Sequence, residues 1–514
     1  MPQILSDRII FDANDWTAGL HPQYAASTPG IQKGGGLASA ASFDPFRFLG
    51  YASVGMDAAA AEGASVVTTV LRSITSYSAT SAYCISGGAL LHELNPAMAI
   101  ITTTGGIFPH TISPHGGHQN AVGSDSVIYN ANIDSVLTKQ LFYSWNDGTD
   151  GDIGTFNFIT TFDDDFMSTV PSGKAVLNIT NQHPMIVGDR NILYIGDGGN
   201  VHQYDGQTGA NGTFTKNALE LGNDYIITSF AKFQKYLIIF ATTEMWGRGI
   251  STVFFWNYFD DFPSEIFQLG DGNCDGGFVY QNTVGCFLYA PSADRGNASR
   301  RGRMLLYDGS RFKEQISFLA NIPIYRGVDI NGDIIYWNSQ GTLYSFGSPF
   351  KGVNSGLNIL CNLLGSTSGA LKNINGITYS SSGTAASGGM EQLNGRYQTG
   401  GGSTSMAFPN FPKDKCGKIT RVDIIFGQLA TAGRSFTLQL RNNDNELSQI
   451  NTAISTIAAG SLIQKFTTKS DGSQFDTFVG LSAILNWAAG TDNNDAPLID
   501  KIIVYFDAIN YNSL

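Results

Sequence analysis

Four arginines, Arg295, Arg300, Arg301 and Arg303, form the one basic cluster of the sequence, in a stretch rich in Gly, Asn and Ser between two predicted strands. Guanidinium groups bind phosphates and carboxylates through paired hydrogen bonds. The rest of this region is poor in arginine. The cluster therefore indicates either an interface with a partner or the exposed tip of a loop.

Histidines and carboxylates also gather locally. His110, His115 and His118 lie within nine residues, but no cysteine or carboxylate stands nearby at the spacing of a zinc site. The acidic runs lie at 146–152, 163–165 and 271–277. None of them has the ligand spacing or the closing glutamate of a helix–loop–helix calcium site. We interpret the histidines as loop or interface residues and the acidic runs as solvated hairpin tips, and we predict no metal and no cofactor.

Signatures of an enzyme active site are missing from the sequence. The glycine patterns of a nucleophile elbow, a phosphate loop and a dinucleotide site are absent. Glycosidases need two carboxylates that face each other across a cleft, and nothing in the sequence pairs Glu220, Glu244 and Glu265. We predict no catalytic residues and keep a glycan-degrading enzyme as an alternative.

The elements that would position these residues belong to a repeat. Between Tyr83 and Phe346, an apolar strand, a Gly or polar turn and a second strand ending in an aromatic recur. The hairpins start near Tyr83, Val127, Ile192, Tyr236, Val284 and Ile334. Their mean spacing of about 50 residues is close to the blade period of a propeller. Solenoid repeats are usually shorter and more uniform, which favours a propeller.

The predicted fold is all-β: a β-propeller of six to seven blades followed by a β-sandwich of jelly-roll type. Residues 1–50 are predicted to be an extended arm and 51–350 the propeller, and a strand near 46–51 is a candidate to close the ring. The Gly- and Ser-rich residues 351–410 are predicted to be connecting loops, and 411–514 the sandwich. Met56–Leu71 is the best candidate for a helix.

Composition and charge limit the function further. The chain has 514 residues with 60 glycines, and only 14% of its residues are charged. Five widely spaced cysteines without a C-x-x-C pair predict buried thiols in a reducing cytosol. No secretory signal and no membrane-spanning run is seen. The first 350 residues hold 18 basic and 31 acidic groups. This balance predicts good solubility, and an alternative role for it is to repel DNA that passes through a nearby channel.

Several segments resemble the propeller proteins of tailed-phage virions. These segments are 235–246, 277–289 and 332–344 in the repeat, and 418–426 and 436–443 near the C-terminus. The resemblance implies a virion structural protein, a nozzle, hub or connector of the tail, assembled in the host cytoplasm. Its partners would be copies of itself in a ring and other tail proteins, with DNA passing without sequence-specific contact. The resemblance assigns no binding residues.

One alternative is a receptor- or glycan-binding protein at the tail tip. Glycans stack on exposed aromatic side chains, and the tryptophans that would serve are Trp16, Trp246 and Trp487.

Overall fold

The computed structural model describes residues 8–13, 37–41, 56–60, 70–79, 81–88, 90–94, 108–112, 122–147, 151–169, 177, 182–243, 249–289, 302–318, 323–347, 356–363, 365–383, 388–397, 402–407, 415–428, 436–442, 445–452, 462–469, 472–475, 477–478, 481–489 and 496–510. Its regular structure is nearly all β. The helical pieces in these ranges are single turns: α1 (Phe166–Thr169), η2 (Asp189–Asn191) and η4 (Tyr325–Gly327). Within them, no helix has the length and apolar content that a membrane crossing requires.

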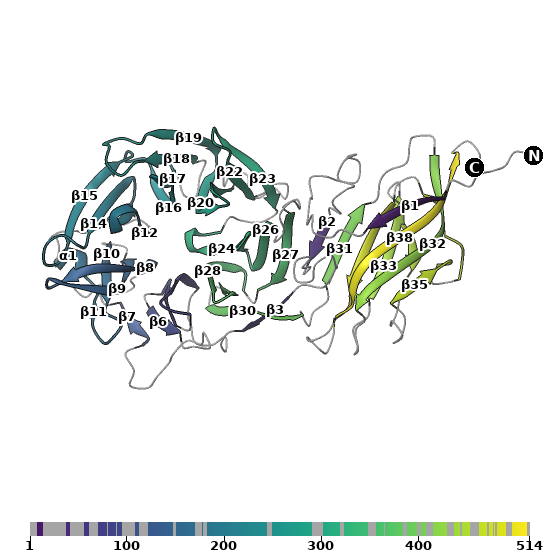
Figure 1. The fold of residues 1–514 in the computed structure, drawn as a ribbon, viewed down its shortest axis with the longest axis horizontal. Helices are drawn as coiled ribbons and strands as arrows, with labels where there is room; N and C mark the ends of the chain where they lie inside the picture. The colour runs from purple at the N-terminus through teal and green to yellow at the C-terminus, as the bar shows by residue number, and fades with distance from the viewer. Residues whose placement is uncertain are drawn as a thin grey trace, which may run out of the picture.

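Seven four-stranded antiparallel sheets stand in a ring, and the first strands of successive sheets contact each other around its centre (Figure 1). Blade 1 consists of β4 (Leu71–Ser76), β5 (Ala82–Ser86), β6 (Leu90–Leu94) and β7 (His110–Thr111). Blade 2 consists of β8 (Val122–Ile133), β9 (Val136–Asn146), β10 (Gly151–Phe156) and β11 (Phe162–Asp163). Blade 3 consists of β12 (Met185–Val187), β13 (Leu193–Asp197), β14 (Asn200–Asp205) and β15 (Thr213–Glu220).

Blades 4 to 6 continue the ring with the same strand order. Blade 4 consists of β16 (Ile226–Phe233), β17 (Tyr236–Thr242), β18 (Ile250–Trp256) and β19 (Glu265–Asp271). Blade 5 consists of β20 (Asn273–Tyr280), β21 (Thr283–Tyr289), β22 (Gly302–Tyr307) and β23 (Phe312–Phe318). Blade 6 consists of β24 (Val328–Asn331), β25 (Ile334–Ser339), β26 (Thr342–Gly347) and β27 (Gly356–Asn362). Each predicted hairpin start lies in a blade strand or directly before one. The predicted propeller is therefore confirmed, with seven blades among the described residues.

Blade 7 closes the ring with two distant parts of the chain. Its first three strands are β28 (Thr367–Ile374), β29 (Ile377–Gly383) and β30 (Gly388–Tyr397), and its outer strand is β3 (Met56–Ala60), which precedes blade 1. Because β3 is hydrogen-bonded to β30, the beginning and the end of the propeller are held in one sheet.

The turns between first and second strands explain several sequence choices. Asp134 and Ser135, and likewise Gln281 and Asn282, all have positive φ angles. Two consecutive positive φ values are the signature of a type I′ hairpin, whose twist matches that of the paired strands. Asn, Asp and Gly adopt this geometry at low cost, which is why such residues punctuate the repeat.

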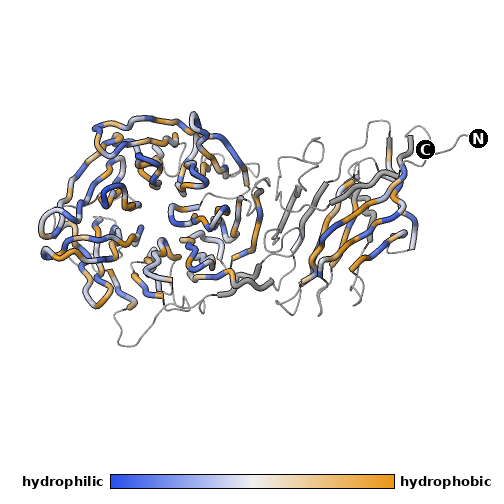
Figure 2. Tube along the Cα trace, in the orientation of Figure 1, coloured by the Kyte–Doolittle hydropathy of each residue, from blue (hydrophilic) through white to orange (hydrophobic). Residues whose placement is uncertain are grey.

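The second domain is a sandwich of two five-stranded sheets, seen beside the propeller in Figure 1. One sheet contains β1 (Arg8–Ala13), β38 (Leu498–Asn510), β32 (Lys415–Gln428), β35 (Ile463–Phe466) and β36 (Thr477–Phe478). The other contains β2 (Leu37–Ala41), β31 (Gly402–Ala407), β37 (Leu481–Trp487), β33 (Phe436–Asn442) and β34 (Asn445–Thr452). In β37, buried and half-buried residues alternate, and Figure 2 shows the corresponding change between apolar and polar residues along the sandwich strands.

One apolar cluster continues from the propeller into the sandwich. It contains Trp337 and Leu357 of blade 6 together with Leu485 and Phe506 of the sandwich. Strand β2 of the sandwich also contacts β27, the outer strand of blade 6. Shared burial of this kind opposes independent motion of two domains, so the sandwich is joined to blade 6 by packing as well as by the chain.

Three expectations from the sequence differ from the structure. Residues 8–13 and 37–41, predicted as part of an extended arm, are strands β1 and β2 of the sandwich. The predicted connecting loops at 351–410 contain β27 and the first three strands of blade 7, followed by β31. Residues 56–60, in the candidate helix, form β3, because pairing with β30 outweighs the helix preference of alanine. The candidate closing strand at 46–51 lies outside the described residues.

Candidate functional site: a plugged channel that opens on one face

The centre of the ring is occupied by a short segment of blade 6. Residues 323–327 precede β24, and the turn η4 within them contacts strands β4, β16, β20 and β28 of four other blades. Gly327 permits this fit, since a Cβ there would lie 3.1 Å from the carbonyl oxygen of Gly369. The segment therefore acts as a plug in the channel.

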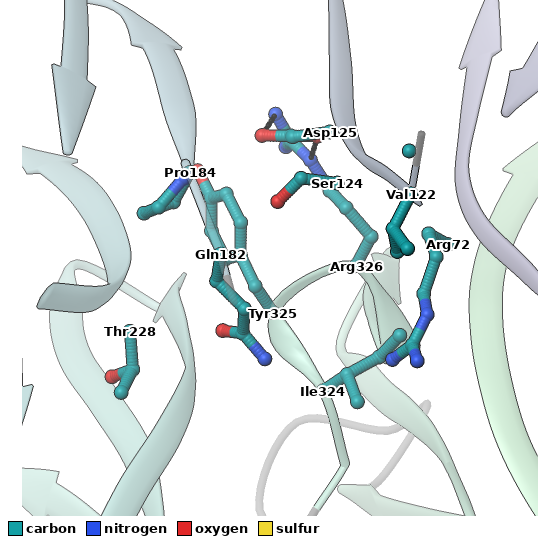
Figure 3. A pocket seen from close by; sticks show the side chains of 11 residues that line it. Arg72, Val122, Ser124, Asp125, Gln182, Pro184, Thr228, Ile324, Tyr325 and Arg326 are labelled. Atoms are coloured by element: carbon teal, nitrogen blue, oxygen red, sulfur yellow. Dashed lines mark hydrogen bonds and ion pairs between the residues drawn. The ribbon is translucent and has the colours of Figure 1, made fainter. Parts of the chain in front are cut away.

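An ion pair fixes the plug to the opposite side of the ring. The Nε of Arg326 donates to Oδ1 of Asp125 at 2.6 Å, and its second guanidinium nitrogen donates to Oδ2 at 3.0 Å (Figure 3). The same nitrogen donates to the carbonyl oxygen of Met185 at 2.9 Å. Asp125 also accepts from the backbone N–H groups of Ser126 and Met185. Blades 2, 3 and 6 are thus tied together at the channel centre.

Burial sets the electrostatics of this clamp. Burial lowers the pKa of Arg326, but the charge of Asp125, the hydrogen bond to it and the nearby Tyr325 together outweigh this effect, and the net pKa is raised. Burial also raises the pKa of Tyr325, whose ring lies 4.3 Å from the Arg326 guanidinium carbon. A bidentate arginine–carboxylate pair is among the strongest hydrogen-bonded ion pairs in proteins. The plug is therefore held in its charged form at neutral pH.

Arg72 and Asp275 form a second pair of ionisable groups near the plug. Burial lowers the pKa of Arg72, and the charge of Asp275 acts in the opposite direction. Burial raises the pKa of Asp275 well above its usual range, although a hydrogen bond from the N–H of Gly276 and the charge of Arg72 oppose this. Arg72 lines a cavity of about 30 Å³ on this side of the plug (Figure 3), a volume on the order of one water molecule.

On the other side of the plug the channel widens into a cavity of about 390 Å³, which we call the funnel. Tyr325 and Arg326 line its inner end, and inner-strand residues of all seven blades form its wall. The partly exposed side chains of Val127, Ile186 and Val279 contribute apolar surface, while Lys232 lies at its exposed edge. The funnel has the size and mixed lining of a ligand site.

The funnel opens on the face that carries the turns between first and second strands and between third and fourth strands, which we call the loop face. Exposed large apolar side chains gather on this face. They are Tyr77, Val136, Leu137, Ile159, Phe259, Phe262 and Ile377. Phe262 is 76% exposed and Ile159 71%. Exposed apolar groups concentrated on one side of a molecule mark interaction surfaces.

Arg303, the one described member of the predicted arginine cluster, does not line the channel cavities. Arg303 lies in β22 of blade 5, where its guanidinium is 3.9 Å from Glu314, and both side chains are more than one-third exposed. Arg295, Arg300 and Arg301 lie outside the described residues. Their predicted role at an interface stays a prediction.

The described parts of the acidic runs are largely packed rather than solvated, which corrects the prediction of exposed hairpin tips for these residues. Asp164 accepts from Nε2 of His110 at 3.0 Å and from the Tyr143 hydroxyl at 2.5 Å. Asp152 and Asp275 are also buried. The ring of His110 stacks on Phe162 at 3.7 Å. Within the described ranges, no three His, Cys, Asp or Glu side chains are close enough to hold a metal ion. His115 and His118 lie outside those ranges.

Blade 3 contains a buried polar cluster that sequence reasoning missed. Nε2 of His202 donates to Asp197 at 3.1 Å, because its Nδ1 accepts from the N–H of Asn217. Nδ1 of His183 lies 3.6 Å from the other Asp197 oxygen, and all three side chains are fully buried. No substrate can reach them, so they hold the blade together.

The carboxylates and tryptophans that the sequence suggested for catalysis or glycan binding are not brought together among the described residues. Glu220 and Glu265 are exposed on the outer strands of blades 3 and 4, and Glu244 lies outside the described residues. Trp487 is buried in the sandwich core and donates to the Pro497 carbonyl oxygen at 3.1 Å. Trp16 and Trp246 lie outside the described ranges. All five cysteines are buried, as predicted.

No protein-family model and no curated protein matches the chain. Among solved structures, it is similar to the Dos1 propeller (9% identity, TM-score 0.42, covering 66% of this chain and 95% of that one). It is also similar to the WD40 propeller domain of Doa1 (10% identity, TM-score 0.40, covering 66% of this chain and 96% of that one). A third similar structure is Chaetomium thermophilum Raptor (12% identity, TM-score 0.39, covering 63% of this chain and only 28% of that one). Likeness this low transfers no function. The propeller assignment rests on the seven sheets themselves.

Proposed function

We propose that this chain is a structural protein of a tailed-phage virion, a nozzle, hub or connector of the tail, without catalytic activity of its own. Its propeller would dock neighbouring tail proteins or further copies of the chain through the loop face. The observation that carries this proposal is the concentration of exposed apolar side chains on the loop face, from blades 1, 2, 4 and 7.

The architecture supports a mechanical role. The ring is closed by β3, the channel is plugged by the Arg326–Asp125 pair, and the sandwich shares an apolar cluster with blades 5 and 6. Assembly partners need surfaces of fixed geometry, because ordering a mobile surface on binding costs free energy. The acidic balance and the resemblance of the repeat to phage propellers agree with this role.

A two-part experiment tests the proposal. Proteomics and electron microscopy of purified particles should find the chain in the tail, and its absence from particles would refute the proposal. In a complementation assay, Phe259→Asp with Phe262→Asp should lower the yield of infectious particles by at least about tenfold, since buried aromatic anchors dominate interface energies.

The matched control is Ile250→Asp. Ile250 is 43% exposed but lies at the opposite end of its blade, where β18 begins. It receives an aspartate on the other face of the propeller and should leave the yield unchanged. Equal loss in both variants would indicate general destabilisation rather than a docking surface.

Glycan recognition is the second candidate, and it has one specific observation in its favour. Phe259 is 63% exposed and is backed by the Arg190 guanidinium at 4.4 Å, with Asp260 and Asp261 beside it. An exposed ring flanked by carboxylates suits stacking against a sugar. Binding to a glycan array that is abolished by Phe259→Ala would favour this reading over docking of a protein.

A further inference from the structure

The funnel is closed at its inner end, so a ligand enters and leaves it from the loop face. Tyr325 and Arg326 form that end, and Arg326 donates hydrogen bonds to Asp125 and to the Met185 carbonyl oxygen. Tyr325 also donates to Met185, at 3.3 Å. A partner segment could therefore enter without passing through the ring.

The wall of the funnel carries both polar and apolar surface. Its apolar surface comes from partly exposed side chains of four blades, which are Val127, Ile186, Val279 and Val328. A cavity of about 390 Å³ lies near the lower end of the range of about 300–1,000 Å³ that ligand pockets occupy. These four apolar side chains favour an occupant that brings one apolar group.

Two lysines give the funnel a cationic edge. Nζ of Lys232 is 2.6 Å from Asp189, and Nζ of Lys372 is 3.2 Å from Asp329. An ammonium group has three donors, so one acidic partner leaves each lysine able to bind another anion. Asp329 also lines the funnel, but its Oδ2 already accepts from the N–H of Asn373 at 2.7 Å.

We propose that the funnel binds a protein segment with an apolar anchor between acidic residues. The apolar anchor would contact Ile186 and Val279, and the acidic residues would meet Lys232 and Lys372 on opposite sides of the ring, in blades 4 and 7. This inference deepens the proposed function, because the segment would belong to a neighbour docked on the loop face.

Fluorescence anisotropy with the purified full chain tests the inference without a virion. The probes are fluorescein-labelled hexapeptides of sequence Glu-Glu-Phe-Leu-Glu-Glu, Lys-Lys-Phe-Leu-Lys-Lys and Glu-Glu-Gly-Gly-Glu-Glu. The first should bind at least about tenfold more tightly than the other two, because it alone combines both features that the lining recognises. Equal affinity for all three, or preference for the lysine peptide, would overturn the inference.

Variants locate the binding. Lys232→Glu with Lys372→Glu should weaken binding of the first peptide about tenfold, from two partly exposed ion pairs. Lys235→Glu is the matched control, because Lys235 lies beside the same β16–β17 hairpin but does not line the funnel. Val279→Trp should block the funnel and abolish binding, with a melting curve to confirm folding. Unchanged binding in the double lysine variant would also overturn the inference.

The two proposals fail separately. If the chain is absent from particles but the peptide binds as described, the phage assignment falls and the funnel site stands. If the chain is in the tail but the peptides bind alike, the funnel site falls and the docking role stands.

Discussion

The second strands of blades 4 and 7 are buried to the same depth with opposite chemistry. In both β17 and β29, the first residue is at least partly exposed and the next six are buried. β17 reads Tyr-Leu-Ile-Ile-Phe-Ala-Thr, whereas β29 reads Ile-Thr-Tyr-Ser-Ser-Ser-Gly. Blade 4 is held by apolar packing, and blade 7 by hydroxyl groups that satisfy one another and the backbone.

The serines of blade 7 act as connectors. Ser381 accepts from the N–H of Leu71 in blade 1 and donates to the Gly389 carbonyl oxygen, each at 3.0 Å. Ser382 donates to Glu391 at 2.6 Å, and Asn338 of blade 6 donates to Ser380 at 2.9 Å. Buried polar groups are tolerated only when hydrogen-bonded. The stability of blade 7 therefore depends on the geometry of its hydrogen bonds, whereas that of blade 4 depends on apolar side chains filling its core.

The largest effect should come from removing volume in blade 4. Trp256 is 1% exposed, packs edge-on against Tyr194 of blade 3, and donates to the Asp260 carbonyl oxygen at 2.6 Å. Trp256→Ala should lower the free energy of unfolding by about 3–5 kcal/mol, measured by chemical denaturation. Ile266→Ala, at a side chain that is 58% exposed, is the control and should cost little.

The second-largest loss of stability should come from the plug, because the first strands of blades 4 and 7 both contact it. Arg326→Met leaves the buried Asp125 without its cation, and we expect a loss of about 3 kcal/mol. Adding Asp125→Asn to this variant should recover part of the loss, since it removes the unpaired charge. A double variant less stable than Arg326→Met would show that the charge of Asp125 is not the cause.

A smaller loss is expected in blade 7. Ser381→Ala removes the acceptor of the Leu71 N–H and should cost about 1–3 kcal/mol, although the side-chain volume hardly changes. Ser78→Ala, at an exposed serine in the first turn of blade 1, is the control. If Ser381→Ala were as stable as the wild type, packing rather than hydrogen bonding would hold blade 7.

A pH-dependent effect in blade 2 sharpens the contrast between charge and volume. Burial raises the pKa of Asp152 to about 7, whereas an unfolded aspartate has a pKa of about 3.9. The folded chain keeps a proton that the unfolded chain releases between these values. The contribution of Asp152 to stability is thus greatest below about pH 4 and is lost as the pH rises to about 7.

Asp152→Asn should remove this dependence. Between pH 5 and 7, stability of the wild type relative to the variant should fall by up to about 1.4 kcal/mol per pH unit. Denaturation of both proteins across this range measures the difference. A constant difference would mean that Asp152 does not titrate there.

The same contrast explains what the sequence could predict. Blades rich in aromatic and β-branched residues, such as those of β17 and β25, show the strand pattern directly. Blade 7 does not, because Ser380–Ser382 resemble a flexible linker until their partners are known. The strands β1 and β2 were missed for a related reason, since their partners lie more than 350 residues away.

The plug was also hidden. Segment 323–327 carries no repeat pattern, and its role depends on contacts with other blades. One signal was present: Asp125 lies in a strand between Val122 and Val127, and a carboxylate within a buried strand needs a partner. The sequence could not identify Arg326 as that partner, because the residues are 201 positions apart.

The closure of the ring by β3 has a consequence for synthesis. A ribosome makes residues 56–60 long before β30, with which they pair, and makes β1 long before β38. The propeller cannot close until β30 has been made, and the sandwich cannot be completed until β38 has been made. During translation β1, β2 and β3 must wait with unpaired edges, and such edges invite pairing with other chains. Production of this protein should therefore benefit from chaperones that protect nascent strands.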